Sequence, residues 1–402
     1  MDRIAVLENS IQEYAWGSKT FIPELIGELS PAKNPKAEMW MGSHPTAPSM
    51  AVYDGNRISL AELISRDPSD ILGASVAEKF SNKLPFLFKV LAAAKPLSIQ
   101  SHPDREQAKA GFMRENMEKR SMDSADRSYR DENHKPELIC ALDPLWALKG
   151  FRKIEDIIDI MDKFGDSAKG LEIDILRSQH GGGGLKGFFI ALMNMERDRR
   201  RNLLDEIAAR IEDLGLSGPA FDWIRRLNRE YPGDIGVLSP LFLNVVHLQP
   251  TEAIHIPSGE LHAYLGGAGL ELMANSDNVI RGGLTSKHID LPELVNILDF
   301  TPHIPDILRP EGSDALETSY PVIAEEFMLS VISLNSKDSI YESRVSRSAE
   351  IMICTGGEAA VTDRGNGEVL EFHRGTTLFV PAAVERYLIQ GEATIYKASV
   401  PL

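Results

Sequence analysis

The hydrophobic period of the chain changes twice, and this limits the folds it can adopt. Between about residues 151 and 231, apolar residues recur at the three-to-four-residue spacing of amphipathic helices, as at Ile154, Ile157, Ile158 and Met161. On both sides the apolar runs are short and are separated by Gly, Pro, Asn and Asp, which is typical of strands joined by turns. The pattern therefore predicts a β-rich protein with a helical insertion.

A run of four glycines, 181–184, interrupts the helical segment. Glycine-rich loops bind phosphates when Gly-Lys-Ser/Thr follows, because the lysine and the hydroxyl then contact the nucleotide and its metal. Here Leu185, Lys186 and Gly187 follow instead. We therefore expect a flexible connector rather than a phosphate-binding loop.

Short strands and turns resume near residue 241 and continue from about residue 327 to the end, which favours a jelly roll or a related barrel. Two segments look like copies of one hairpin, because 252–257 and 376–381 both end in proline. Five residues past each proline stand His262 in the first copy and Arg386 in the second. We therefore expect the second barrel to be structural and to bind no metal.

Composition excludes several classes of protein. The chain has 402 residues, 43% of them apolar, and a mean hydropathy of -0.17, as expected for a globular protein of two or three domains. A net charge of -16 argues against nucleic acid as a partner. No signal sequence or membrane-length apolar run is evident, so we expect a cytoplasmic protein without a membrane partner.

The two cysteines, Cys140 and Cys354, lie far apart in the sequence, and each stands in an apolar run. This placement favours free buried thiols over a disulfide or a thiolate metal site.

Residues 98 to 102 place polar side chains on one face of a predicted strand. Because side chains alternate along a strand, Ser98, Gln100 and His102 point the same way. The surrounding sequence is apolar, and buried polar groups cost free energy unless something satisfies them. A metal ion would satisfy Gln100 and His102, and so would ordinary hydrogen bonds.

Three more segments, 133–137, 257–264 and 271–287, are dense in functional side chains. They add Glu137 and His262 to the pair on the predicted strand. Two imidazoles, one carboxylate and one amide make a nitrogen and oxygen ligand set that suits zinc. A single carboxylate leaves such a site net positive, which preserves Lewis acidity toward a sugar oxygen or a bound water.

Together these motifs resemble those of the type I mannose-6-phosphate isomerases, zinc enzymes of the cupin superfamily. The resemblance extends over nearly the whole chain, with several long motifs in the same order. Among them are Tyr14-Ala-Trp-Gly17, Glu38-Met-Trp-Met-Gly-Ser-His-Pro45 and Asn275-Ser-Asp-Asn-Val-Ile-Arg281.

The resemblance implies one zinc ion per chain, bound by Gln100, His102, Glu137 and His262. Ser101 stands where the family usually has valine. Because Ser101 lies on the opposite face of the strand, this departure leaves the predicted ligand set unchanged.

The family interconverts mannose 6-phosphate and fructose 6-phosphate through a cis-enediol, which requires a base and stabilisation of charge on two oxygens. The resemblance therefore predicts a small sugar phosphate as the partner. It assigns proton transfer or enediolate stabilisation to a catalytic set and leaves open which member is the base. This catalytic set is Arg281, Lys135, His134 and Asp277.

The predicted substrate site combines phosphate ligands with residues that line the pocket. An acidic protein that binds a dianion needs concentrated cationic donors, so Lys89, Ser98 and Lys287 are the phosphate candidates. Tyr264 and Glu271 are expected to line the pocket and to orient their neighbours.

The predicted fold is therefore mainly β, with two cupin jelly-roll domains and an α-helical domain. We expect residues 1–150 and 237–320 to form the catalytic cupin domain. Residues 151–236 would form the helical insertion, and residues 321–402 a metal-free cupin-like domain. We also expect a monomer.

Two alternatives use the same fold. A sugar-phosphate sensor would keep the pocket without catalysis, but the intact catalytic set weighs against it. An iron cupin that reacts with oxygen would use two histidines and one carboxylate, which are also present here. Elemental analysis of the purified protein separates iron from zinc.

Overall fold

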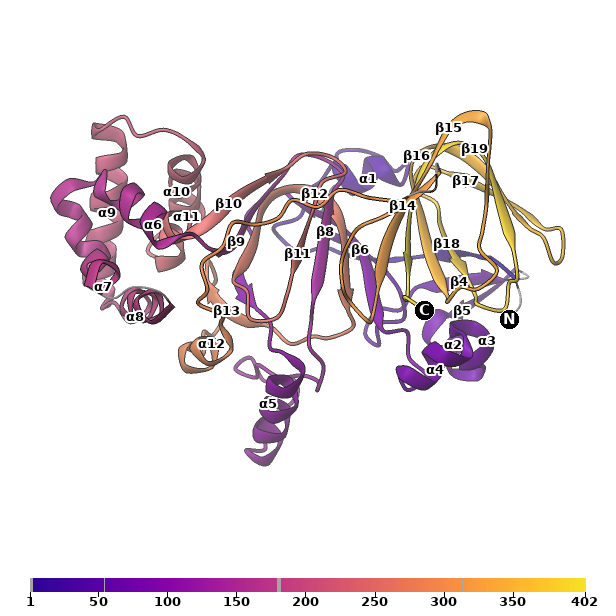
Figure 1. The fold of residues 1–402 in the computed structure, drawn as a ribbon, viewed down its shortest axis with the longest axis horizontal. Helices are drawn as coiled ribbons and strands as arrows, with labels where there is room; N and C mark the ends of the chain where they lie inside the picture. Colours follow the sequence, from indigo (N-terminus) through magenta and orange to yellow (C-terminus); the bar gives the residue numbers. More distant parts are fainter. Residues whose placement is uncertain (1–2, 54, 179–181, 313, 315) are drawn as a thin grey trace.

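The computed structural model describes residues 3–53, 55–178, 182–312, 314 and 316–402. Two antiparallel sheets form the middle and one end of the molecule, and a group of helices forms the other end (Figure 1). This arrangement confirms the predicted fold class, mainly β with a helical insertion.

The first sheet contains the segments that the sequence marked as dense in functional side chains. Its ten strands are β2 (Ser10–Gln12), β3 (Glu38–Met41), β6 (Phe86–Ala93), β7 (Ile99–Ser101), β8 (Glu137–Ala141), β9 (Leu145–Phe151), β10 (Leu243–Leu248), β11 (Ala253–Ile256), β12 (His262–Ala274) and β13 (Ile280–Gly283). Strand β12 joins the two halves of this sheet. Its beginning pairs with β7 and β9, and its end pairs with β6 and β8.

The second sheet combines strands from both ends of the chain. Its nine strands are β1 (Ala5–Glu8), β4 (Met50–Tyr53), β5 (Asn56–Ser59), β14 (Glu317–Ser319), β15 (Met328–Glu342), β16 (Glu350–Asp363), β17 (Val369–His373), β18 (Thr377–Val380) and β19 (Tyr387–Ser399). The two ends meet where β1 pairs antiparallel with β18, with Ala5 opposite Phe379.

This pairing differs from the predicted grouping of residues 1–150 with the catalytic barrel. Strands β1, β4 and β5 belong by hydrogen bonding to the sheet of the C-terminal strands. The physical reason is that β18 would otherwise present an open edge, and β1 supplies the antiparallel partner that satisfies it.

The helical segment follows β9 and returns to the sheet at β10. It contains α6 (Ile154–Asp162), a 3-10 helix (Gly165–Leu171), α7 (Ile173–Ser178), α8 (Gly182–Met193), α9 (Arg197–Asp213), α10 (Pro219–Glu230), a second 3-10 helix (Ile235–Leu238) and α11 (Ser239–Phe242). Its apolar faces share one core with the outer face of the first sheet, where Ile157, Ile207 and Ile211 are buried together with Leu148 and Phe151. The predicted helical pattern is confirmed.

The glycine run differs from its prediction. Gly182–Gly184 form the start of α8 rather than a flexible connector, and Gly181 lies outside the described residues. A glycine within a helix costs about 1 kcal/mol relative to alanine. Burial of Leu185, Phe188 and Phe189 from the same helix in the core outweighs that cost.

Six shorter or isolated helices complete the fold: α1 (Phe21–Leu25), α2 (Leu60–Arg66), α3 (Pro68–Leu72), α4 (Ala74–Lys79), α5 (Arg105–Met117) and α12 (Leu291–Ile297). Helices α2 to α4 lie beside the second sheet (Figure 1), and the amide of Ala382 donates to the carbonyl of Ile71 in α3. Helix α5 projects from the first sheet and begins with a capping box formed by Asp104 and Gln107.

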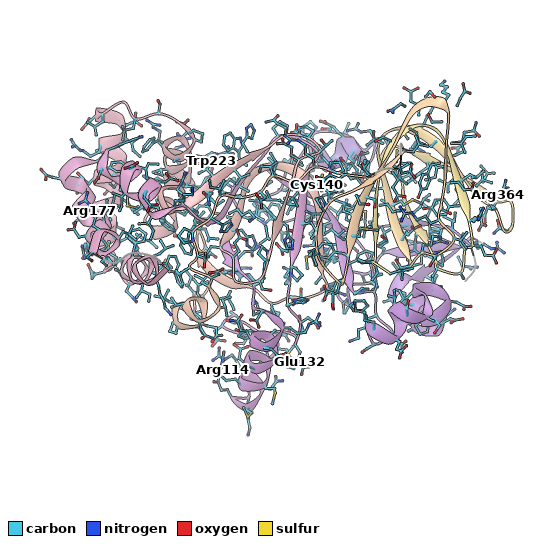
Figure 2. The ribbon with its side chains drawn as sticks, viewed as in Figure 1. Arg114, Glu132, Cys140, Arg177, Trp223 and Arg364 are labelled. Atoms are coloured by element: carbon cyan, nitrogen blue, oxygen red, sulfur yellow. The ribbon has the colours of Figure 1, made fainter. Side chains whose placement is uncertain are left out.

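Both cysteines are free and buried, which confirms their prediction. Cys140 lies in β8, within the packed strands at the middle of the molecule (Figure 2). Within the described ranges, none of the helices has the length and apolar character needed to cross a membrane.

Candidate metal centre and active site

Strand register brings the predicted metal ligands together. Gln100 in β7 lies directly opposite His262, the first residue of β12, and paired residues of antiparallel strands share a face. His102 follows the end of β7, and Glu137 is the first residue of β8. Four positions spread over more than a third of the chain therefore converge on one point inside the barrel.

The geometry is that of a ligand cluster. His102, Glu137 and His262 each offer one ligand atom, and these atoms all lie within 4.8 Å of one another. His102 Nε2 is 3.2 Å from Glu137 Oε1, and His262 Nε2 is 3.3 Å from Glu137 Oε2. All three side chains are buried, so water does not compete for these atoms.

Backbone carbonyls orient both imidazoles. His102 Nδ1 donates to the carbonyl of Asn278 at 2.7 Å, and His262 Nδ1 donates to the carbonyl of Glu260 at 3.0 Å. A proton on Nδ1 leaves Nε2 as the free lone pair, and both Nε2 atoms face Glu137. Metal-binding histidines are usually held by this kind of second hydrogen bond.

The protonation states suit a cation. Burial lowers the pKa of His102 to about 4. Burial would raise the pKa of Glu137, but its contacts with His102 and Lys135 hold it well below its usual value. Among the described residues, His102 Nε2 and Glu137 Oε2 are buried without a hydrogen-bond partner. A neutral His102 and an ionised carboxylate with unused lone pairs are in the form that binds a metal.

Gln100 completes the set. Its Nε2 lies 3.3 Å from His262 Nε2, and rotation of the amide by 180° brings its oxygen to this position. An amide oxygen, two imidazole nitrogens and a carboxylate fit zinc. The residues present therefore fit the predicted metal ion.

Charged residues surround the cluster inside the barrel. Lys135 Nζ is 3.2 Å from Glu137 Oε1. Lys89 Nζ lies 2.9 Å from Glu271 Oε2 and 3.8 Å from Glu38 Oε2. Although burial alone would lower the pKa of Lys89, the two carboxylates raise it, so this lysine remains charged between them.

The hydroxyl of Tyr264 is buried without a hydrogen-bond partner in the part of the chain that the structure describes. Burial, with the charge of Glu271 next in size, raises its pKa well above the usual value. Tyr264 therefore stays neutral beside His262, a predicted metal ligand whose ring centre is 6.2 Å away.

A second basic group lies on β13 and after it. Arg281 pairs with Gln100 across the β7–β13 ladder, so the two side chains share a face. The charge of Arg281 lowers the pKa of Lys287, and burial and Arg130 add to this effect. Ser98 is half-buried and precedes β7 by one residue. Arg281, Lys287 and Arg130 thus concentrate positive charge beside the metal ligands.

Two members of the predicted catalytic set, His134 and Asp277, do not contact the predicted metal ligands. His134 Nε2 is 2.7 Å from Glu326 Oε1 and 3.1 Å from Arg105 Nη2, while its neighbour Lys135 turns toward the metal ligands. Asp277 is exposed, and its Oδ2 lies 3.3 Å from His44 Nε2. Within the described residues, neither side chain forms a hydrogen bond or an ion pair with Gln100, His102, Glu137 or His262.

Sequence reasoning missed two residues of this site. Glu38 is a buried carboxylate that accepts from Trp40 Nε1 at 2.6 Å and faces Lys89. Asn278 is fully buried, and its Nδ2 donates to the carbonyls of Asp131 and Asn133, both at 2.9 Å. Both residues lie in motifs that the sequence analysis had noted. The feature that could have identified them is a polar residue within an otherwise apolar or turn-like stretch.

Comparison with known proteins decides the family. Residues 4–154 match a family model described as phosphomannose isomerase type I, catalytic domain, and residues 168–243 match its helical insertion domain. The mannose-6-phosphate isomerase of Salmonella typhimurium is 38% identical over 381 residues, which cover 94% of each chain. The chain belongs to the type I phosphomannose isomerase family.

Other relatives and solved structures agree. The Escherichia coli mannose-6-phosphate isomerase is 37% identical over 97% of each chain, and the human protein is 32% identical over 94% of each chain. A crystal structure of mannose 6-phosphate isomerase with zinc bound superposes with a TM-score of 0.92 at 37% identity, covering 99% of this chain and 100% of that one. The family predicted from the motifs is thereby confirmed, and zinc binds to a phosphomannose isomerase of the same fold.

Proposed function

We infer that this chain is a zinc-dependent aldose-ketose isomerase that interconverts D-mannose 6-phosphate and D-fructose 6-phosphate through a cis-enediol. One observation carries the inference. The buried cluster of His102, Glu137 and His262 offers unused ligand atoms in a chain that aligns end to end with mannose-6-phosphate isomerases. The zinc-bound relative supports the identity of the metal.

We propose that Gln100, His102, Glu137 and His262 hold the zinc ion. When bound, zinc supplies positive charge that polarises a substrate oxygen or a bound water. The surrounding apolar strands exclude solvent, which strengthens the effect of every charge in the pocket.

We propose that Lys135 and Arg281 act at the reacting carbons. Isomerisation moves a proton between C1 and C2, while negative charge grows on the two oxygens. Lys135 contacts Glu137, and Arg281 shares a strand face with Gln100, so both cations are placed to stabilise that charge.

The remaining members of the predicted set receive different roles in this proposal. The contact of His134 with Glu326 favours a positioning role, because it fixes the segment that carries Lys135. Asp277 is held by His44 and has a lowered pKa, mainly through this hydrogen bond. An ionised Asp277 can accept a proton, so it stays a candidate for the base.

We propose that Lys287 and Ser98 bind the phosphate beside Arg281. The mutual repulsion of the cations supports this role, because Arg281 lowers the pKa of Lys287 and a dianion would relieve that repulsion. Lys89 was also a phosphate candidate, but Glu271 and Glu38 already balance its charge. We therefore propose that Lys89, Glu271 and Tyr264 orient sugar hydroxyls.

The remaining features of the proposal concern the whole chain. We propose a catalytic cupin domain, a helical insertion over residues 151–236 and a metal-free C-terminal domain that also includes strands β1, β4 and β5. We also propose a cytoplasmic monomer that acts on a small sugar phosphate. Gel filtration with light scattering tests the oligomeric state.

A coupled assay with mannose 6-phosphate tests the activity. Zinc-loaded protein is expected to convert the substrate, chelation to abolish turnover, and added zinc to restore it. His262→Ala and Glu137→Gln each remove a ligand and are expected to lose both zinc and activity. No turnover by the zinc-loaded protein, or full activity in either variant, would contradict the proposal. Iron in place of zinc on elemental analysis would favour the oxygen-dependent alternative.

A further inference from the structure

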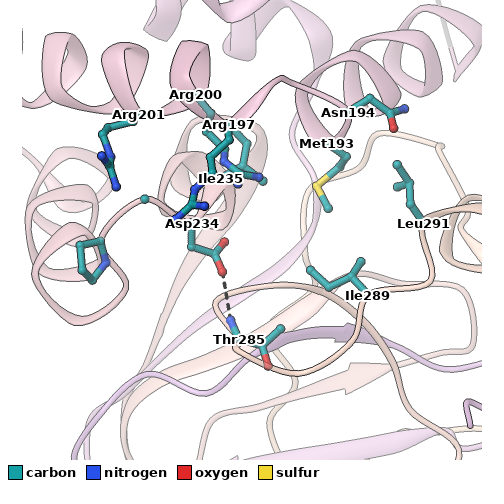
Figure 3. Close-up of a pocket in the computed structure, with 12 residues that line it drawn as sticks. Met193, Asn194, Arg197, Arg200, Arg201, Asp234, Ile235, Thr285, Ile289 and Leu291 are labelled. Carbon is teal, nitrogen blue, oxygen red and sulfur yellow. Dashed lines mark hydrogen bonds between the residues drawn. The ribbon is translucent and has the colours of Figure 1, made fainter. Parts of the chain in front are cut away.

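A cavity away from the metal centre lies between the helical insertion and the first sheet (Figure 3). Its volume is about 620 Å³. Helix α9 lines one side, and the segment from Thr285 to Leu291 lines another. The walls therefore come from two separate parts of the fold.

Three arginines from the first turns of α9 line this cavity: Arg197, Arg200 and Arg201. Cations at the beginning of a helix are disfavoured by the helix dipole, which prefers carboxylates there. The helix itself therefore does not favour their position, where Arg197 and Arg201 are exposed and Arg200 is half-buried.

In the part of the chain that the structure describes, these guanidinium groups have no carboxylate partner. Across the described ranges, no ion pair or side-chain hydrogen bond engages any of the three, and Arg200 Nε is buried without a partner. By contrast, Arg199 on the same turn binds Glu172 at 2.5 Å and does not line the cavity. The unpartnered charge is thus confined to the arginines that face the cavity.

One carboxylate, Asp234, also lines the cavity, and its oxygens are already engaged. Oδ1 accepts from the amide of Gly236 at 2.7 Å, and Oδ2 accepts from the amide of Thr285 at 3.1 Å (Figure 3). A single occupied carboxylate leaves three guanidinium groups with excess positive charge. That excess is the complement of a small anion with more than one negative charge.

We propose that this cavity binds a small, multiply charged anion, either a phosphate-bearing or a polycarboxylate molecule, at a site separate from the zinc centre. The occupant would border the segment that carries Lys287, because the Lys287 amide donates to Thr285 Oγ1 at 3.0 Å. The site therefore adjoins a proposed phosphate ligand of the active site without including it.

Calorimetric titration of the zinc-loaded protein at low ionic strength tests the proposal. The probes are sulfate and benzene-1,3,5-tricarboxylate, and the parent protein carries Arg281→Gln to weaken anion binding at the active site. In this background the parent is expected to keep one anion site. Adding Arg197→Gln and Arg201→Gln together is expected to weaken binding at least about tenfold, because charge-assisted hydrogen bonds are lost.

Arg199→Gln in the same background is the control, because it removes a positive charge from the same part of α9 at a residue that does not line the cavity. Its affinity is expected to stay within about twofold of the parent. Sulfate binding alone assigns the site to phosphate-like anions, and tricarboxylate binding alone assigns it to carboxylates. The proposal is overturned by binding of neither probe, by unchanged affinity in the double variant, or by an equal loss in Arg199→Gln.

Discussion

At the scale of single residues, the site depends on side chains that hold the ligands as much as on the ligands. Asn278 is the clearest case. Its backbone carbonyl accepts from His102, while its side chain accepts from the amide of Arg130 at 2.7 Å and donates to two carbonyls of the same loop. Asn278 therefore fixes both a metal ligand and the segment that leads to Lys135.

Replacing Asn278 by Asp is expected to weaken zinc binding about tenfold or more and to destabilise the protein by about 1–3 kcal/mol. A carboxylate cannot donate to the carbonyls of Asp131 and Asn133, so these would lose their partner. Competition with a chelator measures the zinc affinity, and urea unfolding measures the stability. Asn296→Asp, at an exposed asparagine, is the control. Equal results for the two variants would refute the proposed role.

Ser101 shows a departure from the family pattern that has a measurable consequence. Its side chain is fully buried, and its hydroxyl has no hydrogen-bond partner in the described part of the chain. An unsatisfied buried hydroxyl costs about 1–3 kcal/mol.

Ser101→Val is therefore expected to raise the free energy of unfolding by about 1 kcal/mol and to leave the zinc content unchanged. Ser49→Val is the matched control, because Ser49 is equally buried but donates to Asn9 Oδ1 at 2.8 Å and accepts from the Gly42 amide at 3.0 Å. The control should lose stability. Destabilisation by Ser101→Val would show that its hydroxyl is satisfied.

At the scale of elements, the second sheet repeats the arrangement of the catalytic one. Strand β11 has four residues, as has β18, and the strands that follow, β12 and β19, have 13 residues each. Ile256 pairs with Glu137, and Val380 pairs with Glu350, each just before the matched proline. Glu350 therefore occupies the position that Glu137, a proposed metal ligand, has in the first sheet.

The repeat differs in its charges. Glu271 lies opposite Ile139, and Lys397 lies opposite Met352 at the matching position. Lys397 Nζ is 2.6 Å from Glu317 Oε1 and 3.2 Å from Glu350 Oε1, and all three residues are buried. An ammonium group thus balances the carboxylates of the second barrel, where the first barrel has metal ligands.

Lys397→Met is expected to destabilise the protein by about 3–5 kcal/mol near neutral pH, because buried Glu317 loses its ion pair with Lys397 and buried Glu350 keeps only the longer one with Arg347. Urea unfolding measures the change, and Lys337→Met in the exposed part of β15 is the control. The zinc content should stay the same. Unchanged stability would show that Lys397 does not balance these carboxylates.

The same cluster gives the sign of a pH effect. Burial acts to raise the pKa of Glu317, but Lys397 and its hydrogen bonds hold it below the usual value of 4.5. A carboxyl group with a depressed pKa contributes stability above its unfolded pKa and loses that contribution as the pH falls through its folded pKa. The stability difference between the wild type and Lys397→Met should therefore shrink as the pH falls below 4.5. A difference that stays constant would contradict this linkage.

The sequence predicted local features better than distant pairings. Helical spacing at Ile154 and Ile157 identified the insertion, and strand alternation put Gln100 and His102 on one face. The prediction of a flexible connector at the glycine run was wrong, because packing of α8 outweighs the preference of glycine for turns. The pairing of β1 with β18 could not be predicted from the local sequence. Alternation of apolar and polar residues shows which face of a strand is buried, but it does not show which other strand it pairs with.

At the scale of the whole molecule, a bound zinc ion would connect β7, β8 and β12 across the helical insertion. A ligand that binds only the folded state stabilises it by about 2.7 kcal/mol at a free concentration 100 times its Kd. Zinc is therefore expected to raise the melting temperature, as measured by differential scanning calorimetry with and without chelator. The His262→Ala variant should show no such dependence, and an equal shift in that variant would place the stabilising metal elsewhere.

The pairing of β1 with β18 also has a consequence for how the chain is made. Residues 5–8 leave the ribosome long before their partners at 377–380 are synthesised. At about 5–20 residues per second, this delay is roughly 20 to 75 s. During that time β1 has no strand of its own sheet beside it except β4. The nascent chain must therefore keep β1 available for pairing until β18 has been synthesised.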